Sequence, residues 1–196
     1  PVDRIEELTM EKKAVERDLD QLMEEYVDLK LKLEEASKSS TAATEALESE
    51  LFKNKLYGGL IAVQGPGIEV LLDNTPGSYY NIRDDDLLRV INDLRGAGAE
   101  AIAINDQRII ATTEVRLAGN HINVNLVRLS PPYKVVAIGP ASNLRSSLEL
   151  RGGLKEVLND RGISVTIETK ENVVVPAYTG NLNFQYAKPT QKYERE

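Results

Sequence analysis

The chain has 196 residues, of which 41% are hydrophobic and 28% are charged, and its net charge is −7. This composition is that of a folded chain, and it excludes one that is disordered or membrane-embedded in bulk. The absence of cysteine excludes disulfides, thiol catalysis and cysteine-ligated metal sites. No apolar run reaches the length of a membrane span or a signal peptide.

The first 36 residues carry a heptad repeat. Position a holds Ile5, Lys12, Leu19, Tyr26 and Leu33, and position d holds Leu8, Val15, Leu22, Leu29 and Ala36. So narrow an apolar stripe is typical of a coiled coil, and it cannot be buried by its own helix. We therefore predict oligomerisation through a coil seam formed by Ile5, Leu8, Val15, Leu19, Leu22, Tyr26, Leu29 and Leu33. The polar Lys12 at an a position favours a parallel dimer.

Three regions follow from this pattern. Residues 1–57 are predicted to be a coiled-coil helix with a weak joint at 37–42, where hydroxyl residues lower helix propensity; a break in the rod is the alternative. Residues 58–187 form a globular domain, and 188–196 are a polar tail. Residues 1–56 hold 9 basic and 15 acidic side chains and 57–196 hold 15 and 16, so the acidity belongs to the rod. No basic stripe is present, which argues against a nucleic-acid partner.

Turn and periodicity signals divide the globular region into elements. We predict that a helix ends at Gly58 and Gly59 and that a hairpin follows over 60–73, with its turn at 64–67. The next predicted element is a helix that has Asp84 as its N-cap residue and ends at Arg95. Its apolar face is Leu87, Leu88, Val90, Ile91 and Leu94. A strand over 99–104, a tight turn at Asn105 and Asp106, extended chain over 107–117 and one strand over 122–129 come next. A strand over 133–138, helices over 141–150 and 154–159, and strands over 163–169 and 173–175 complete the domain.

Helices that alternate with mainly antiparallel strands indicate the α+β class. The β-α-β…β-α-β rhythm predicts a ferredoxin-like (split βαβ) sandwich with extra β-hairpins.

The strongest candidate for a ligand or partner contact is Asn105, Gln107 and Arg108, at the end of an apolar strand. A sheet edge can present such side chains, and Arg108 could clamp a carboxylate or a phosphate. The alternative is that Asn105 and Asp106 only form the turn while Arg108 pairs with an acid such as Glu100.

Other polar groups have simpler explanations. The glycines at 65 and 67 match no phosphate-loop pattern. The acids at 84–86 suit a helix N-terminus better than a cation site, and His121 is the only histidine. No paired carboxylates, nucleophile–base set or metal constellation stands out. We therefore predict a non-enzymatic protein with no catalytic residues, metal or cofactor.

The segment 92–108 (NDLRGAGAEAIAINDQR) resembles the signature of bacterial proteins grouped as domain of unknown function 881, which includes division-initiation-type proteins. Further matching pieces are Gly65-Pro66-Gly67-Ile68, Pro131-Pro132-Tyr133 followed by Ala137-Ile138-Gly139, and Pro176-Ala177-Tyr178. The resemblance covers about Gly59 to Lys188. Asp106 departs from the small residue, often glycine, expected at its position.

This resemblance implies a single-pass membrane protein with a short cytoplasmic start, one span, a coiled coil and this domain outside the membrane. Such proteins often lie among cell-division and envelope genes, and no catalytic activity is assigned to them. We therefore expect this chain to be a soluble fragment that begins after the span. Its expected role is a homodimeric scaffold that binds a protein of the division or wall machinery. The alternative is a ligand-sensing extracytoplasmic domain that signals through the coiled coil.

Overall fold

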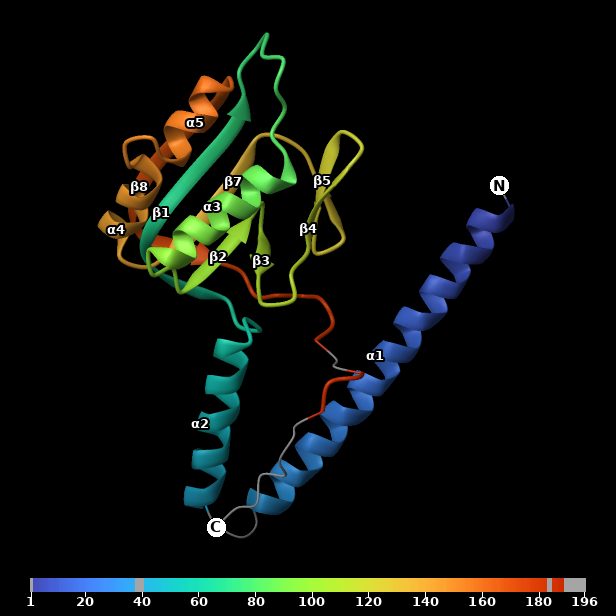
Figure 1. Cartoon of the computed structure of the whole chain (residues 1–196). Helices are drawn as coiled ribbons and strands as arrows, with labels where there is room; N and C mark the ends of the chain where they lie inside the picture. The colour runs from blue at the N-terminus through green and yellow to red at the C-terminus, as the bar shows by residue number, and fades with distance from the viewer. Residues whose placement is uncertain (1, 38–40, 183–184, 189–196) are drawn as a thin grey trace. The chain divides into compact units, whose positions relative to one another are not determined.

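The computed structural model describes residues 2–37, 41–182 and 185–188. Its contacts divide the chain into two units, Pro1–Asn54 and Lys55–Glu196, and each is described by itself. The helices of the described residues are α1 (Val2–Ser37), α2 (Thr41–Tyr57), α3 (Asp84–Gly96), α4 (Ala141–Glu149) and α5 (Leu154–Asp160) (Figure 1). The strands are β1 (Val63–Asn74), β2 (Ala101–Ile104), β3 (Gln107–Ile109), β4 (Val115–Ala118), β5 (His121–Val124), β6 (Val127–Leu129), β7 (Tyr133–Ile138) and β8 (Ile163–Val175).

The predicted coil seam lies on α1. Of the seam residues whose side chains are described, Leu19, Leu22, Tyr26 and Leu29 are 46–62% exposed and Leu33 is half-buried. The side chains of Ile5, Leu8 and Val15 lie outside the described residues, as do residues 38–40 of the predicted joint. Within one chain the seam from Leu19 to Leu29 is therefore exposed, and oligomerisation stays a prediction. No helix of the described residues is both long and apolar enough to cross a membrane.

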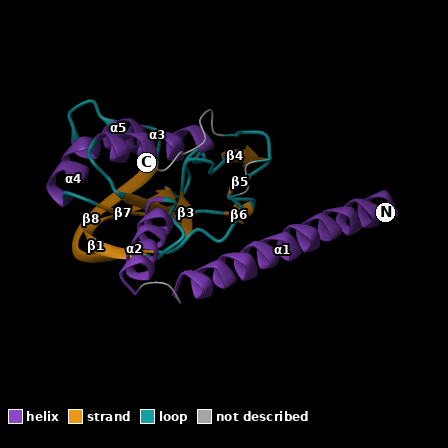
Figure 2. Cartoon of the chain, turned by 90° about the horizontal axis from the view of Figure 1, so that it is seen from below, coloured by secondary structure: helices purple, strands orange, loops and turns teal. Residues whose placement is uncertain are grey.

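The core of the second unit is a five-stranded sheet in the order β3-β2-β7-β1-β8, in which all neighbouring strands are antiparallel. Helices α3, α4 and α5 cover one face of this sheet (Figure 2). From α3, Leu87, Val90, Ile91 and Leu94 are buried against it at helical spacing. The predicted fifth member of this face, Leu88, is 39% exposed because it lies beside the stripe. The α+β class is confirmed.

The predicted hairpin over 60–73 is wrong, because β1 is one strand that pairs with β7 on one side and β8 on the other. The register of β1 against β8 shifts between Gly65 and Gly67, which marks a β-bulge that accommodates Pro66. A Cβ atom on Gly67 would lie 1.9 Å from the carbonyl oxygen of Ala137. These glycines therefore permit close approach of β7 and do not form a turn. The strands predicted over 163–169 and 173–175 are likewise one strand, β8.

A second sheet of three antiparallel strands, β4-β5-β6, packs its buried side chains into the same core. The single strand predicted over 122–129 is wrong, because the chain reverses at Asn125 and Leu126, whose φ angles are 51° and 65°. Asparagine tolerates this left-handed conformation, which explains how an alternating pattern can contain a turn. Leu126 is 81% exposed at the tip.

The acids at 84–86 begin α3, although the helix is capped differently from the prediction. Arg83, not Asp84, is the N-cap residue, and its backbone N–H donates to the carboxylate of Asp86 at 3.0 Å. The carboxylate of Asp84 instead accepts the backbone N–H of Leu117 at 2.8 Å. This bond ties the start of α3 to the small sheet, so these carboxylates have structural partners.

Candidate functional site

A pocket of about 490 Å³ opens beside the edge strand of the main sheet. Its wall comes from the end of α2 and the two following glycines, Arg95 of α3, residues 99–102, residues 108–112 and Leu182. All of these residues belong to the unit Lys55–Glu196. Pockets of this size are typical of small-molecule sites.

The end of α2 forms one side of the pocket. Gly59 has a φ of +74°, and the backbone N–H groups of Gly59 and Leu60 donate to the carbonyls of Leu56 and Lys55 at 3.1 and 2.9 Å. This is the glycine-terminated helix end that the sequence predicts. A Cβ atom on Gly59 would lie 2.8 Å from Ile110 and 3.4 Å from Nε of Arg108. The helix end therefore turns directly over Arg108.

The predicted turn at Asn105 and Asp106 is confirmed. Both residues have positive φ, 43° and 65°, and Ile104 pairs with Gln107 across the hairpin. The side chain of Asn105 accepts the backbone N–H of Lys134 at 2.6 Å and donates to the carbonyl of Pro132 at 3.3 Å. Asn105 thus fastens the hairpin, and neither it nor the half-buried Gln107 lines the pocket.

Arg108 is the predicted contact residue that the fold does bring into the pocket. Only 6% of it is exposed, and its Nη1 atom donates to the carbonyls of Ile61 and Pro176 at 3.3 and 3.0 Å. Its own carbonyl accepts Nδ2 of Asn125 at 2.8 Å, which fixes the backbone as well. The guanidinium thus joins the segment after α2, strand β3 and the segment after β8.

The buried guanidinium has no carboxylate partner among the described residues, so the alternative of an ion pair with Glu100 is wrong there. Burial lowers the pKa of Arg108, because desolvation disfavours the charged form. A buried cation without a countercharge is costly unless it is hydrogen-bonded. The carbonyl contacts offset part of that cost, and they leave the Nε and Nη2 groups without an acceptor in the described part of the chain.

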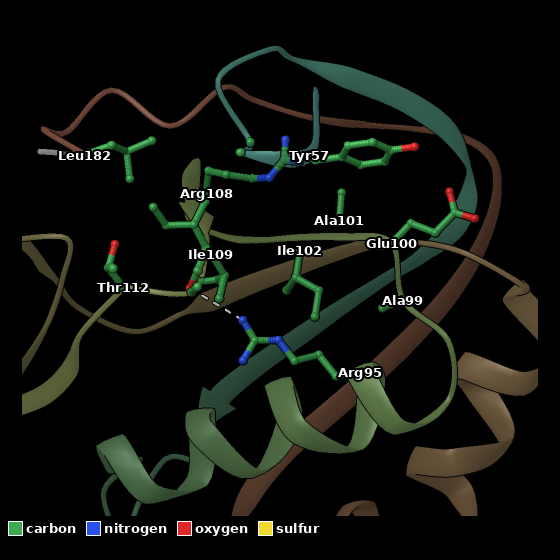
Figure 3. A pocket seen from close by; sticks show the side chains of 14 residues that line it. Tyr57, Arg95, Ala99, Glu100, Ala101, Ile102, Arg108, Ile109, Thr112 and Leu182 are labelled. Atoms are coloured by element: carbon green, nitrogen blue, oxygen red, sulfur yellow. Dashed lines mark hydrogen bonds between the residues drawn. The ribbon is translucent and has the colours of Figure 1, made fainter. Parts of the chain in front are cut away.

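Figure 3 shows Arg108 and Arg95 on opposite sides of Ile102 and Ile109, with Glu100 to one side. Arg95 reaches from α3 and its Nη2 lies 3.5 Å from the carbonyl oxygen of Ile110. The pocket wall between Arg108 and Arg95 is formed mainly by aliphatic side chains. Such a pocket can bind an anionic group attached to an apolar body.

Catalytic chemistry has little support in this pocket. Its lining contains no histidine, cysteine, serine or lysine, and no hydrogen bond joins its two hydroxyl side chains, Tyr57 and Thr112, to its carboxylate, Glu100. Over the described ranges, no group of three histidine, cysteine, aspartate or glutamate residues is placed to hold a metal ion.

Several lining residues escape sequence reasoning. Tyr57, Arg95 and Leu182 come from segments that are far apart in the chain and meet only in the fold. The one local signal was the polar cluster after an apolar strand, which pointed to Arg108.

A family profile described as "Bacterial protein of unknown function (DUF881)" matches residues 50–188. UPF0749 protein Rv1825 of Mycobacterium tuberculosis is 30% identical over 163 residues, which cover 81% of this chain and 55% of that protein. UPF0749 protein YlxW of Bacillus subtilis is 34% identical over 130 residues, which cover 62% of this chain and 55% of YlxW. The chain therefore spans about half the length of these curated relatives.

A solved structure is also similar to this chain. The crystal structure of an uncharacterised conserved protein from Mycobacterium tuberculosis aligns with a TM-score of 0.62 and 31% identity. The alignment covers 72% of this chain and 99% of that one. Since the profile and the relatives together span most of the sequence, this chain belongs to the DUF881 family of bacterial proteins of unknown function.

Proposed function

We propose that this chain is the binding module of a non-enzymatic, membrane-tethered envelope protein that works in cell division or wall synthesis. The N-terminal helix oligomerises as a parallel coiled-coil dimer, and the α+β domain lies outside the membrane and binds its partner there. The observation that carries the binding role is Arg108, a buried guanidinium that lines a pocket and has no countercharge among the described residues.

The dimer proposal rests on the heptad of α1. Four seam residues, from Leu19 to Leu29, expose about half of their surfaces in the single chain. Apolar side chains repeated every 3.5 residues are stabilised when a second helix covers them. The tether, the location and the division role rest on the resemblance of segment 92–108 to the family signature.

The domain fold is proposed to be ferredoxin-like. Without the edge strand β3, the strand order of the main sheet is β2-β7-β1-β8, with α3 between β1 and β2 in sequence and α4 and α5 between β7 and β8. Such connections in an antiparallel sheet suit a split βαβ arrangement. The three strands β4, β5 and β6 are then an insertion between β3 and β7.

Sedimentation velocity tests the oligomerisation. We expect residues 1–196 to form a dimer at tens of micromolar and residues 57–196 to remain monomeric, because only the longer chain contains the seam. If both chains are monomeric at that concentration, the proposed dimer is wrong. Crosslinking of the full-length protein in cells tests the location. If the crosslinked partners are only cytosolic metabolic enzymes, the proposed envelope location is wrong.

Ligand sensing is the second candidate function, and the position of the pocket favours it. Tyr57, the last residue of α2, lines the pocket, and Gly59 packs against Arg108. A bound ligand would therefore touch the helix end that leads to the coil. A thermal-shift screen with nucleotides, wall fragments and anions tests this function, with Ala111→Trp as the variant that fills the pocket from an exposed lining position. A ligand should raise the melting temperature of the unmodified chain and not that of the variant.

A further inference from the structure

We propose that the pocket binds a carboxylate on an apolar body, held side-on by the Nε and Nη2 groups of Arg108. This inference rests on the proposed binding role of the pocket and names the chemical class of the ligand. The description of the family and the names of the relatives mention no ligand.

The first step in this inference is the division of the guanidinium into two edges. Nη1 is occupied by the carbonyls of Ile61 and Pro176. The opposite edge carries Nε–H and one N–H of Nη2, which lie parallel and match the two oxygens of a carboxylate. No acceptor among the described residues contacts this edge. Arg108 is thus held in place by one edge and offers the other for recognition.

The second step is charge. Arg108 is more than nine-tenths buried, and a carboxylate would supply the countercharge that the described chain does not. The nearby end of α2 provides only a partial negative charge, about half of an elementary charge for a helix terminus. A ligand with a single negative charge therefore matches the guanidinium better than a neutral ligand does.

The third step separates a carboxylate from a phosphate. Glu100 lines the same pocket, and the end of α2 is the negative end of its dipole. Both disfavour a dianion. The lining includes no lysine and no helix N-terminus, and its second guanidinium, that of Arg95, lies on the opposite side of Ile102 and Ile109 from Arg108 (Figure 3). Arg95 is therefore not placed beside Arg108 to supply the further donors that a phosphate uses.

The fourth step is the body of the ligand. The wall next to Arg108 is formed by aliphatic side chains, among them Ala101, Ile110 and Leu182, and by the aromatic ring of Tyr57. These surfaces favour an apolar group beside the carboxylate. Two sources share this chemistry, a small carboxylic acid and the free C-terminus of an apolar peptide.

Isothermal titration of the 196-residue chain tests the proposal with paired probes. Phenylacetate is compared with neutral phenylacetamide, a short alanine–leucine peptide with a free C-terminus is compared with its C-terminal amide, and inorganic phosphate is the third anion. We expect at least one carboxylate to bind at least about tenfold more tightly than its amide, since each 1.4 kcal/mol changes an affinity tenfold. The pair that binds identifies the source.

Three variants locate the binding site. Arg108→Lys keeps the positive charge but removes the parallel Nε–H and Nη2–H groups, and it should weaken carboxylate binding about tenfold or more. Ala111→Trp fills the pocket from an exposed position and should abolish binding even if Arg108→Lys fails to fold. Arg128→Lys is the matched control, because Arg128 is exposed on β6 and does not line the pocket.

The outcomes separate this inference from the proposed function. Equal binding of acid and amide, tighter binding of phosphate, or carboxylate binding that survives Ala111→Trp would overturn the carboxylate assignment. If no carboxylate binds while another screened compound stabilises the chain and not Ala111→Trp, the ligand class is wrong and the binding pocket stands. If no probe of any class has an effect, both are wrong.

Discussion

Replacing Arg108 by methionine tests whether this buried cation exists for stability or for binding. The change removes two charge-assisted hydrogen bonds, from Nη1 to the carbonyls of Ile61 and Pro176, each worth about 1.5–3 kcal/mol. It also removes the several kcal/mol that burial of an uncompensated charge costs. Ile61 and Pro176 are only half-buried, so water can solvate part of the freed carbonyls. The two effects nearly cancel, and we expect the free energy of unfolding to change by no more than about 1 kcal/mol.

Urea denaturation, followed by tyrosine fluorescence and circular dichroism, measures this change. Arg108→Ala is the companion variant, because removal of the whole side chain leaves a void and should cost about 2–4 kcal/mol. Arg128→Met, at an exposed position, should change the stability by less than about 0.5 kcal/mol. A loss above about 3 kcal/mol for Arg108→Met would show that Arg108 is mainly a structural clamp and would refute the reasoning.

Four other substitutions probe the fold. Gly67→Ala places a Cβ 1.9 Å from the backbone oxygen of Ala137 and should lower the stability, measured by thermal unfolding, by about 3 kcal/mol or more. Gly65→Ala should lower it by less, because its Cβ would meet only a side chain, at 3.1 Å. Equal losses would contradict the bulge geometry. Leu126→Gly should stabilise the chain by about 0.5–1 kcal/mol, because a leucine at a φ of 65° is strained and its side chain is 81% exposed; destabilisation would indicate that the side chain has a packing role. Glu149→Gln should cost about 0.5–1 kcal/mol at neutral pH, because hydrogen bonds from its two cationic partners lower the pKa of Glu149 to about 2. This stabilisation is present above the ordinary pKa of 4.5 and is lost as the pH falls toward 2, so the two stabilities should converge there; a constant difference in denaturation across that range would contradict it.

Local signals predicted the fold where they had a single interpretation. The left-handed Asn105 and Asp106, the glycines after α2 and the apolar spacing of α3 each favour one structure, and each prediction is confirmed. The turn predicted at Gly65 and Gly67 is wrong, because glycines flanking a proline are equally compatible with a turn and with a bulge. Only the pairing of β1 with β7 and β8 distinguishes the two.

The site was predictable only in its local part. Arg108 stood out because it follows a turn at the end of an apolar strand. Its contacts with Ile61 and Pro176 could not be read from the sequence, since these partners lie 47 and 68 residues away. Sequence position also gave no reason to separate Arg108 from Asn105, whose side chain holds the hairpin to β7 and does not line the pocket.

The Nε–H resonance of Arg108 provides the most direct test of the central claim, that this buried guanidinium recognises a carboxylate in the pocket. The 196-residue chain is labelled with ¹⁵N-arginine, and the resonance is assigned by its loss in Arg108→Lys. If the claim is right, phenylacetate or the alanine–leucine peptide with a free C-terminus moves this proton downfield and slows its exchange with water, while the matched amide leaves it in place. A resonance that neither phenylacetate nor the peptide with a free C-terminus changes at the highest concentrations used in the titration, or that the matched amide shifts equally, would contradict the claim.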